Sequence, residues 1–226
     1  GGGIRNSALL QVANAKLSNS TIQDIVLARL GNANLTAMTL TGNGKTVLAS
    51  GGSHTLSSTN MGYGSYLKQG HTLQNDGQLR VDAGGVGQAN YLYVEGSGNG
   101  IGASRLGDAA SKIVNTGEMT LSSSGGNLVM RRYNGNNDVV FENSGKLIKD
   151  GTGNALIYAM NLQNSGDVHV QQGKLQYWNT PMQNNGRVIV DAGATFEASL
   201  INNGRLMGNG TVLATAGVEN HGIVAP

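Results

Sequence analysis

The chain has 226 residues, of which 36 are glycine, 2 are proline and none is cysteine. Only 12% of the residues are charged and the formal net charge is +2. The longest block of lysine or arginine is the pair Arg131–Arg132, so the charge pattern does not support nucleic-acid binding. The lack of cysteine excludes disulfides, cysteine metal sites and cysteine nucleophiles. No run of eighteen apolar residues is present, so we expect no membrane span.

Residues 1–60 carry the weakest pattern, and three interpretations of them are open. Aliphatic residues recur every five positions from Val12 to Leu27, which is typical of a pentapeptide-type coil. A second interpretation is a helix from Thr21 to Leu30, with Ser20 as its cap. The third, which we favour, is a set of irregular first coils or a cap. A regular solenoid would then occupy residues 61–226.

Two insertions interrupt the regular part of the chain. Residues 95–111 are long and glycine-rich, and residues 130–138 form a polar stretch with two cations and a tyrosine. We expect both to leave the solenoid as loops, and on one side of it, because both fall late in their repeat. The candidate ligand contacts are Arg131, Arg132, Tyr133 and Trp178.

One phrase recurs along the chain: an apolar residue, any residue, asparagine, any residue, glycine, any residue and an apolar residue. Its asparagines are Asn75, Asn115, Asn143, Asn164, Asn184, Asn202 and Asn220. Its glycines are Gly77, Gly117, Gly145, Gly166, Gly186, Gly204 and Gly222. Successive asparagines are 40, 28, 21, 20, 18 and 18 residues apart, so the first gap spans two units of about twenty residues. Such a period is typical of a solenoid.

The asparagine of each repeat has the same parity as the apolar residues around it. Leu162 stands two positions before Asn164, and Val168 stands four positions after it. Since alternate residues of a strand point to one side, the asparagine points inward with them. A buried amide requires a hydrogen-bond partner, so we expect each asparagine to bond to its counterpart in the next coil, as in an amide ladder. The glycine suits either a corner with positive φ or a close approach of two coils.

These features predict an all-β fold, a right-handed parallel β-helix (β-solenoid) of about ten coils of roughly twenty residues. Hairpin turns of a β-meander also contain Asn-Gly pairs. A meander, however, would not keep apolar residue, asparagine and glycine in one register through seven copies.

Residues with catalytic chemistry are few. Asp82, Asp150 and Asp191 fall at the same offset from their asparagines. They could line a groove, as the acids of β-helical polysaccharide lyases and hydrolases do, or each could cap its own turn. The four histidines are scattered, with no pair at the spacing of metal ligands. We therefore expect no catalytic residue, no cofactor and no metal, with a polysaccharide-degrading enzyme as the alternative.

Aromatic residues have two possible roles in such a fold. They can face outward and stack on sugar rings, or they can fill wide corners inside the coil, and the sequence leaves both open. The residues concerned are Tyr91, Tyr93, Tyr133, Tyr158, Tyr177 and Trp178.

The stretches MQNNGRVIVDAGATF (182–196) and LINNGRLMGNGTV (200–212) resemble the right-handed β-helix passenger domains of autotransporter and two-partner-secretion adhesins of Gram-negative bacteria. The ending GNGTVLATAGVENHGIVAP is especially similar to a coil that these passengers share. The resemblance covers roughly residues 70–226. It implies export, display at the cell surface and a role in adhesion or biofilm matrix, and it transfers no catalytic residue.

We expect a secreted or cell-surface structural and adhesive rod without catalysis. Its expected partners are surface glycans or matrix, and the chain itself. Contact with itself would arise through continuation of the solenoid or end-to-end stacking, because terminal strand edges pair readily with other chains.

Overall fold

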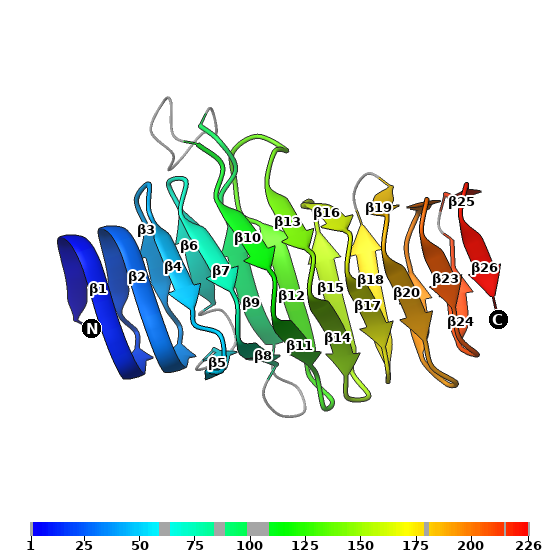
Figure 1. Cartoon of the computed structure of the whole chain (residues 1–226), viewed down its shortest axis with the longest axis horizontal. Helices are drawn as coiled ribbons and strands as arrows, with labels where there is room; N and C mark the ends of the chain where they lie inside the picture. The colour runs from blue at the N-terminus through cyan, green and yellow to red at the C-terminus, as the bar shows by residue number, and fades with distance from the viewer. Residues whose placement is uncertain are drawn as a thin grey trace.

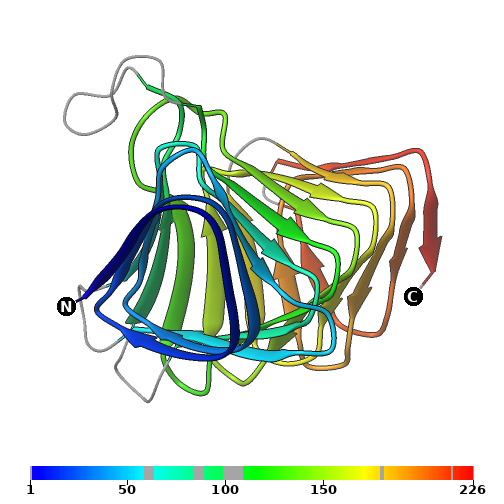
Figure 2. The same ribbon diagram turned by 60° about the vertical axis from the view of Figure 1, so that its left-hand side comes forward.

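The computed structural model describes residues 2–58, 64–83, 89–98, 109–178, 181–214 and 216–225. The chain winds as a right-handed parallel β-helix from one end of a rod to the other (Figures 1 and 2). The predicted fold class is confirmed. Neighbouring coils pair through parallel strands along the whole rod, from the first strand with the second to strand Arg205–Met207 with the last strand, Ile223–Ala225.

The first two coils are single bent strands, and the later coils each have three strands. Strand β1 (Gly3–Ser18) and strand β2 (Thr21–Thr36) each run around all three sides of the rod. The 24 strands that follow stack as three parallel sheets, which we call faces 1, 2 and 3 in the order in which a coil visits them. Eight three-stranded coils and the two initial coils make ten coils in the described part of the chain.

Face 1 consists of β3 (Thr39–Thr41), β6 (Ser65–Lys68), β9 (Ala89–Val94), β12 (Asn127–Arg132), β15 (Asn154–Tyr158), β18 (Lys174–Trp178), β21 (Thr195–Glu197) and β24 (Thr211–Leu213). Face 2 consists of β4 (Lys45–Leu48), β7 (Thr72–Asn75), β10 (Lys112–Asn115), β13 (Val140–Asn143), β16 (Asn161–Asn164), β19 (Met182–Asn184), β22 (Leu200–Asn202) and β25 (Val218–Asn220). Face 3 consists of β5 (Ser53–Ser57), β8 (Gln78–Asp82), β11 (Glu118–Ser122), β14 (Lys146–Asp150), β17 (Asp167–Val170), β20 (Arg187–Val190), β23 (Arg205–Met207) and β26 (Ile223–Ala225).

The N-terminal coils are more regular in register than their sequence suggested. β1 and β2 pair in parallel at a constant offset of 18 residues. The alternative of a helix from Thr21 to Leu30 is wrong, because this stretch lies within β2. The corners repeat with the same offset: Asn6 and Asp24 both have positive φ, and so do Asn19 and Ala37.

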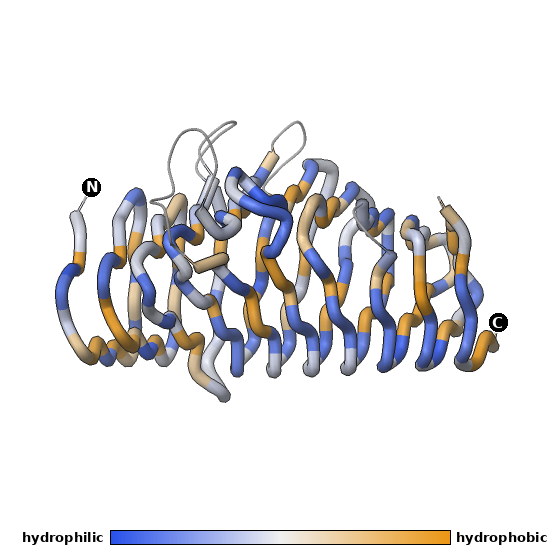
Figure 3. The backbone as a smooth tube through the Cα atoms, turned by 90° about the horizontal axis from the view of Figure 1, so that it is seen from above, coloured by the Kyte–Doolittle hydropathy of each residue, from blue (hydrophilic) through white to orange (hydrophobic). Residues whose placement is uncertain are grey.

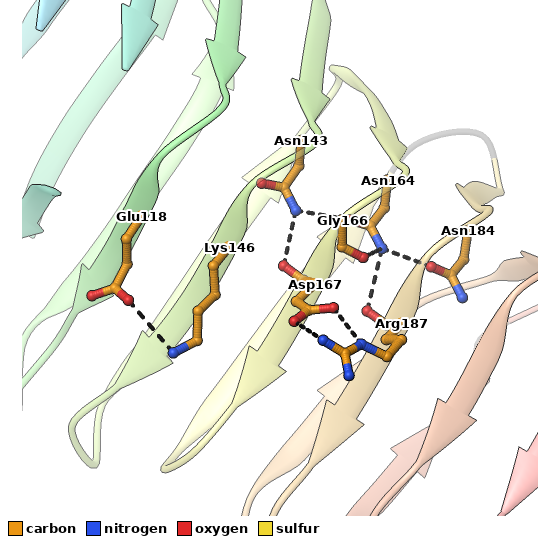
Figure 4. Close-up of polar contacts among 8 residues, drawn as sticks. All are labelled: Glu118, Asn143, Lys146, Asn164, Gly166, Asp167, Asn184 and Arg187. Atoms are coloured by element: carbon orange, nitrogen blue, oxygen red, sulfur yellow. Dashed lines mark hydrogen bonds and ion pairs between the residues drawn. The ribbon is translucent and has the colours of Figure 1, made fainter. Parts of the chain in front are cut away.

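An amide ladder runs through the corner between faces 2 and 3. Asn143 Nδ2 donates to Asn164 Oδ1, and Asn164 Nδ2 to Asn184 Oδ1, each at 2.7 Å (Figure 4). The same bond, at 2.7 to 2.8 Å, links Asn75 to Asn115, Asn115 to Asn143, Asn184 to Asn202 and Asn202 to Asn220. Every amide therefore donates toward the C-terminal end, so the ladder has a direction.

The glycines beside the ladder allow the coils to approach each other. A Cβ added to Gly166 would lie 2.6 Å from the carbonyl carbon of Ser144 and closer still to the Gly145 oxygen. Of the two roles expected for these glycines, close approach applies, since none of them has a positive φ. Positive φ occurs instead at the corner between faces 3 and 1, at Gly173 and Gly193.

The core is a continuous apolar column, and Lys149 is a charged residue within it. Figure 3 shows hydrophobic segments recurring at corresponding places of successive coils. Lys149 occupies the inward position that Leu121 and Val170 fill in the coils before and after it, and it is fully buried. Its Nζ donates to three backbone carbonyls, those of Asp150, Gly151 and Gln172, at 2.6 to 3.0 Å. Burial lowers the Lys149 pKa to about 8.

His71 is a second buried titratable group, and it makes stability depend on pH. Its Nδ1 must donate to the Gly42 carbonyl (3.2 Å), and in the neutral ring Nε2 then accepts from the Thr46 hydroxyl (2.9 Å). Burial lowers its pKa from 6.5 to about 4. Between these values the unfolded chain binds a proton that the folded chain does not, so stability falls as pH falls. We expect a loss of up to about 3 kcal/mol between pH 6.5 and 4. Urea midpoints across this range, compared with those of His71→Gln, measure it; an equal pH dependence in both proteins would contradict it.

The two end coils expose apolar side chains. Leu9 in β1 and Ile223 and Val224 in β26 are each at least half exposed. The expected end-to-end stacking of copies stays a prediction.

Candidate ligand-binding face

One outward column of face 1 carries a series of aromatic side chains. Tyr66 lies opposite Tyr93, Tyr93 opposite Arg131, Arg131 opposite Tyr158, and Tyr158 opposite Trp178. We call these five residues the aromatic column. Since adjacent strands lie roughly 4.8 Å apart, the column is about 20 Å long. Tyr158 and Trp178 are each 42% exposed, while Tyr66 and Tyr93 are half-buried.

The column begins in a cluster of four tyrosines. The rings of Tyr66 and Tyr93 stack with centroids 4.9 Å apart, and Tyr91 stacks on Tyr93 at 5.4 Å. Tyr133 meets Tyr66 and Tyr93 edge to face, at 5.6 and 5.4 Å. Such contacts stabilise by about 0.5–1.5 kcal/mol each beyond the burial of area. Burial raises the pKa of Tyr66 and of Tyr93, so both phenols stay neutral and can donate a hydrogen bond at neutral pH.

Cations are interleaved with these rings. Lys68 Nζ lies 4.6 Å from the centroid of the Tyr66 ring and 5.5 Å from that of Tyr133. The Arg131 guanidinium carbon lies 5.8 Å from the centroid of Tyr158. These distances are within the range of cation–π interactions, which keep each positive charge next to an aromatic ring.

Trp178 closes the column and is fixed in place by Glu197. Its indole Nε1 donates to Glu197 Oε1 at 3.3 Å. The other carboxylate oxygen accepts from Lys174 (3.0 Å) and Gln176 (3.1 Å). The bond from Lys174 is the main cause of the lowered Glu197 pKa. Glu197 thus fixes the orientation of the Trp178 ring, and Lys174 balances the charge of the Glu197 carboxylate.

The two insertions meet at the corner between faces 1 and 2. Gly96 N donates to Asn134 O at 2.9 Å, and Asn136 N donates to Ser97 O at 3.0 Å. The loop expected at 130–138 is shorter than predicted, because residues 130–132 belong to β12. Of the loop expected at 95–111, residues 99–108 lie outside the described residues. The strand assignment places Arg131 in the column itself.

Not every predicted contact residue lies in the aromatic column. Tyr133 follows β12 and is 46% exposed beside the tyrosine cluster. Arg132 is paired with the buried Val94, so it lies at the end of β12 in a different column. Among the six aromatics considered, Tyr177 is buried and its hydroxyl donates to Met160 O at 3.0 Å, while the other five face outward.

The aspartates that could have lined a groove are in contact with basic side chains. Arg80 Nε lies 3.4 Å from Asp82, and Arg80 Nη1 lies 3.3 Å from Asp150, so one guanidinium contacts both carboxylates. Asp191 contacts His169 Nε2 at 2.9 Å. Apart from Arg80–Asp82, which lies within β8, these contacts link different coils of face 3. Glu118–Lys146 and Asp167–Arg187 in Figure 4 do the same.

Tyr66 and Lys68 were not among the ligand contacts that the sequence predicted. They lie in β6. The signal that could have identified Tyr66 is the stretch Ser65-Tyr66-Leu67, which aligns with Leu92-Tyr93-Val94 in the next coil.

Within the ranges that the structure describes, no group of three or more metal-ligating side chains is found, and no helix suited to crossing a membrane. Comparison of the chain with family models, with curated proteins and with solved structures gives no match.

Proposed function

We propose that the chain is a structural and adhesive rod that binds carbohydrate through face 1. One observation carries the proposal: among the described residues, every solvent-facing aromatic side chain lies on face 1 or at the corner directly after it. The aromatics elsewhere, such as Phe141 on face 2, are buried. A random distribution of surface aromatics over three faces would not produce one column.

The chemistry of the column suits sugar rings. An aromatic ring offers an apolar, weakly negative face to the C–H groups of a sugar, and the tyrosine hydroxyl and indole N–H add polar handles. The rings repeat along the rod at the coil spacing, so a linear polysaccharide can contact several of them at once. Several weak contacts on one polymer combine into a higher avidity.

The proposed setting is the outside of a Gram-negative bacterium, as a secreted or surface-displayed adhesin or matrix component. Two features support it. The asparagine-glycine coils resemble autotransporter and two-partner-secretion passengers, and a solenoid without cysteine is stabilised by stacking alone. A rod also presents its binding face at a distance from its point of attachment.

Glycan binding provides the test. The whole chain is applied to an array of neutral and acidic polysaccharides, and the affinity for the bound ones is measured by titration. We expect Trp178→Ala and Tyr158→Ala each to lower affinity about tenfold, the equivalent of one lost stacking contact of about 1.4 kcal/mol. Thermal unfolding should change little, because both side chains are substantially exposed.

Val26→Ala serves as the matched control, because Val26 is also exposed but lies in β2, outside the column. It should bind as the unaltered chain does. Absence of binding to any glycan, or equal binding by the column variants and the control, would refute the proposal.

A further inference from the structure

The cations in and beside the aromatic column differ from most other cations of the middle coils. Lys68, Arg131 and Arg132 have no carboxylate within ion-pair distance among the described residues. Most other cations of these coils form ion pairs: Lys112 with Glu142, Lys146 with Glu118, Lys174 with Glu197, Arg187 with Asp167, and Arg80 with Asp82 and Asp150. Lys149 is the buried exception, held by backbone carbonyls. Among the described residues of the middle coils, the solvent-facing cations without an ion pair therefore lie beside the rings.

Two acids of face 1 and its corners, Glu95 and Glu197, form no ion pair with these cations. Glu95 is buried, and its Oε2 accepts from the backbone N–H of Gln69 at 2.9 Å. Glu197 is occupied by Lys174, Gln176 and Trp178. Between Lys68 and Tyr158 the face therefore carries aromatic rings together with cations that have no carboxylate partner among the described residues.

The positions of Lys68 and Arg131 suit a polymer that lies along the rod. β6 and β12 are two coil steps apart, so the two cations are separated by roughly 10 Å along the axis. Each lies within 6 Å of a ring centroid. A sugar stacked on Tyr158 would thus bring an acidic substituent within reach of Arg131, whose planar guanidinium suits bidentate contact with a carboxylate.

From this arrangement we propose that face 1 binds a linear polysaccharide that carries carboxylate groups, a polyuronate. The sugar rings stack on Tyr158, Trp178 and the tyrosine cluster, and the carboxylates contact Arg131 and Lys68. This inference rests on the proposed carbohydrate-binding function and specifies its ligand class.

Single-stranded nucleic acid also combines aromatic stacking with charge, but it needs a positively charged groove that follows one phosphate per nucleotide. Two cations separated by two coils do not form such a track, and the chain has a net charge of only +2. Carboxylates spaced along a polysaccharide match two separate cations better.

The test uses oligogalacturonate and its methyl ester, which share sugar rings and differ in charge. We expect the whole chain to bind the free acid at least tenfold more tightly than the ester at low salt, with the difference shrinking as salt rises. Arg131→Gln and Lys68→Gln should each lower affinity for the acid several-fold and leave affinity for the ester unchanged. Trp178→Ala should lower both.

Arg205→Gln is the matched control, since it removes the same charge from face 3. It should leave binding of the acid unchanged. Equal affinity for acid and ester would overturn the polyuronate inference and leave the carbohydrate-binding proposal standing. Failure to bind any glycan would overturn both. Tighter binding of a single-stranded DNA oligonucleotide, lost in Arg131→Gln and Trp178→Ala, would assign the face to nucleic acid instead.

Discussion

Replacement of Gly166 by alanine is expected to destabilise the solenoid by about 3 kcal/mol, the upper end of the usual cost of overpacking. The added methyl group would collide with the backbone of Ser144 and Gly145, not with a side chain that could turn away. The coil cannot retreat easily, because Gly166 N donates to Asn143 O at 3.0 Å and the next coil stacks on Gly166 in turn. The midpoint of urea unfolding, followed by circular dichroism, measures the effect.

Gly193→Ala separates this collision from the general cost of replacing a glycine. Gly193 has a φ of 81°, and a Cβ there would meet nothing within 4 Å. Its replacement should therefore cost only the strain of a left-handed residue, about 1–2 kcal/mol. A loss at Gly193 equal to or larger than that at Gly166 would show that contact between coils is not what requires glycine beside the ladder.

The ladder and the glycine stack could be predicted because the signal is local. The asparagine, the glycine and their apolar neighbours lie within seven residues, so insertions elsewhere in a coil do not disturb their alignment. The aromatic column could not be predicted in the same way. Its members, Tyr66, Tyr93, Arg131, Tyr158 and Trp178, are offset by 27, 38, 27 and 20 residues, because coils differ in length at their corners. The sequence alone does not show which corner absorbs each insertion.

The N-terminal coils misled the sequence reasoning for a different physical reason. Buried positions in β2 include Ile22, Ile25 and Ala28, three residues apart, because each corner of a bent strand shifts the inward parity. A spacing of three also resembles the apolar stripe of a helix. The corner residues Asn19 and Asp24 adopt positive φ without glycine, so the usual sign of a corner is missing.

Lys149 shows where pattern reasoning stops. Its position is inward in every neighbouring coil, yet the residue is a lysine whose amine is held by three carbonyls. In the sequence, a charged residue at an inward position looks like an interruption of the apolar repeat. Only the geometry of the adjacent corner, which turns three carbonyl oxygens toward one point, explains how the slot accepts it.

The direction of the ladder makes its ends unequal in energy. At its start, Asn75 lies opposite Leu48, and Asn75 Oδ1 is buried without a hydrogen-bond donor among the described residues. At its other end, Asn220 is exposed and its Nδ2 donates to Gly222 O at 3.2 Å. The chain thus tolerates one unpaired amide oxygen, at the boundary between the apolar column of the first coils and the amide column of the later ones.

This boundary leads to the second large effect. Asn164→Leu should cost about 2–3 kcal/mol, because it leaves Asn184 Oδ1 buried without a donor and removes an acceptor from Asn143 Nδ2. Asn75→Leu should cost about 1 kcal/mol, because it only transfers the existing unpaired oxygen from Asn75 to Asn115. Both sites are fully buried, so urea midpoints of the two variants compare like with like. Equal losses would mean that the number of unpaired oxygens does not set the energy of the ladder. A larger loss at Asn164 would locate that energy in the continuity of the amide chain, since each interior asparagine both donates and accepts while the first only donates.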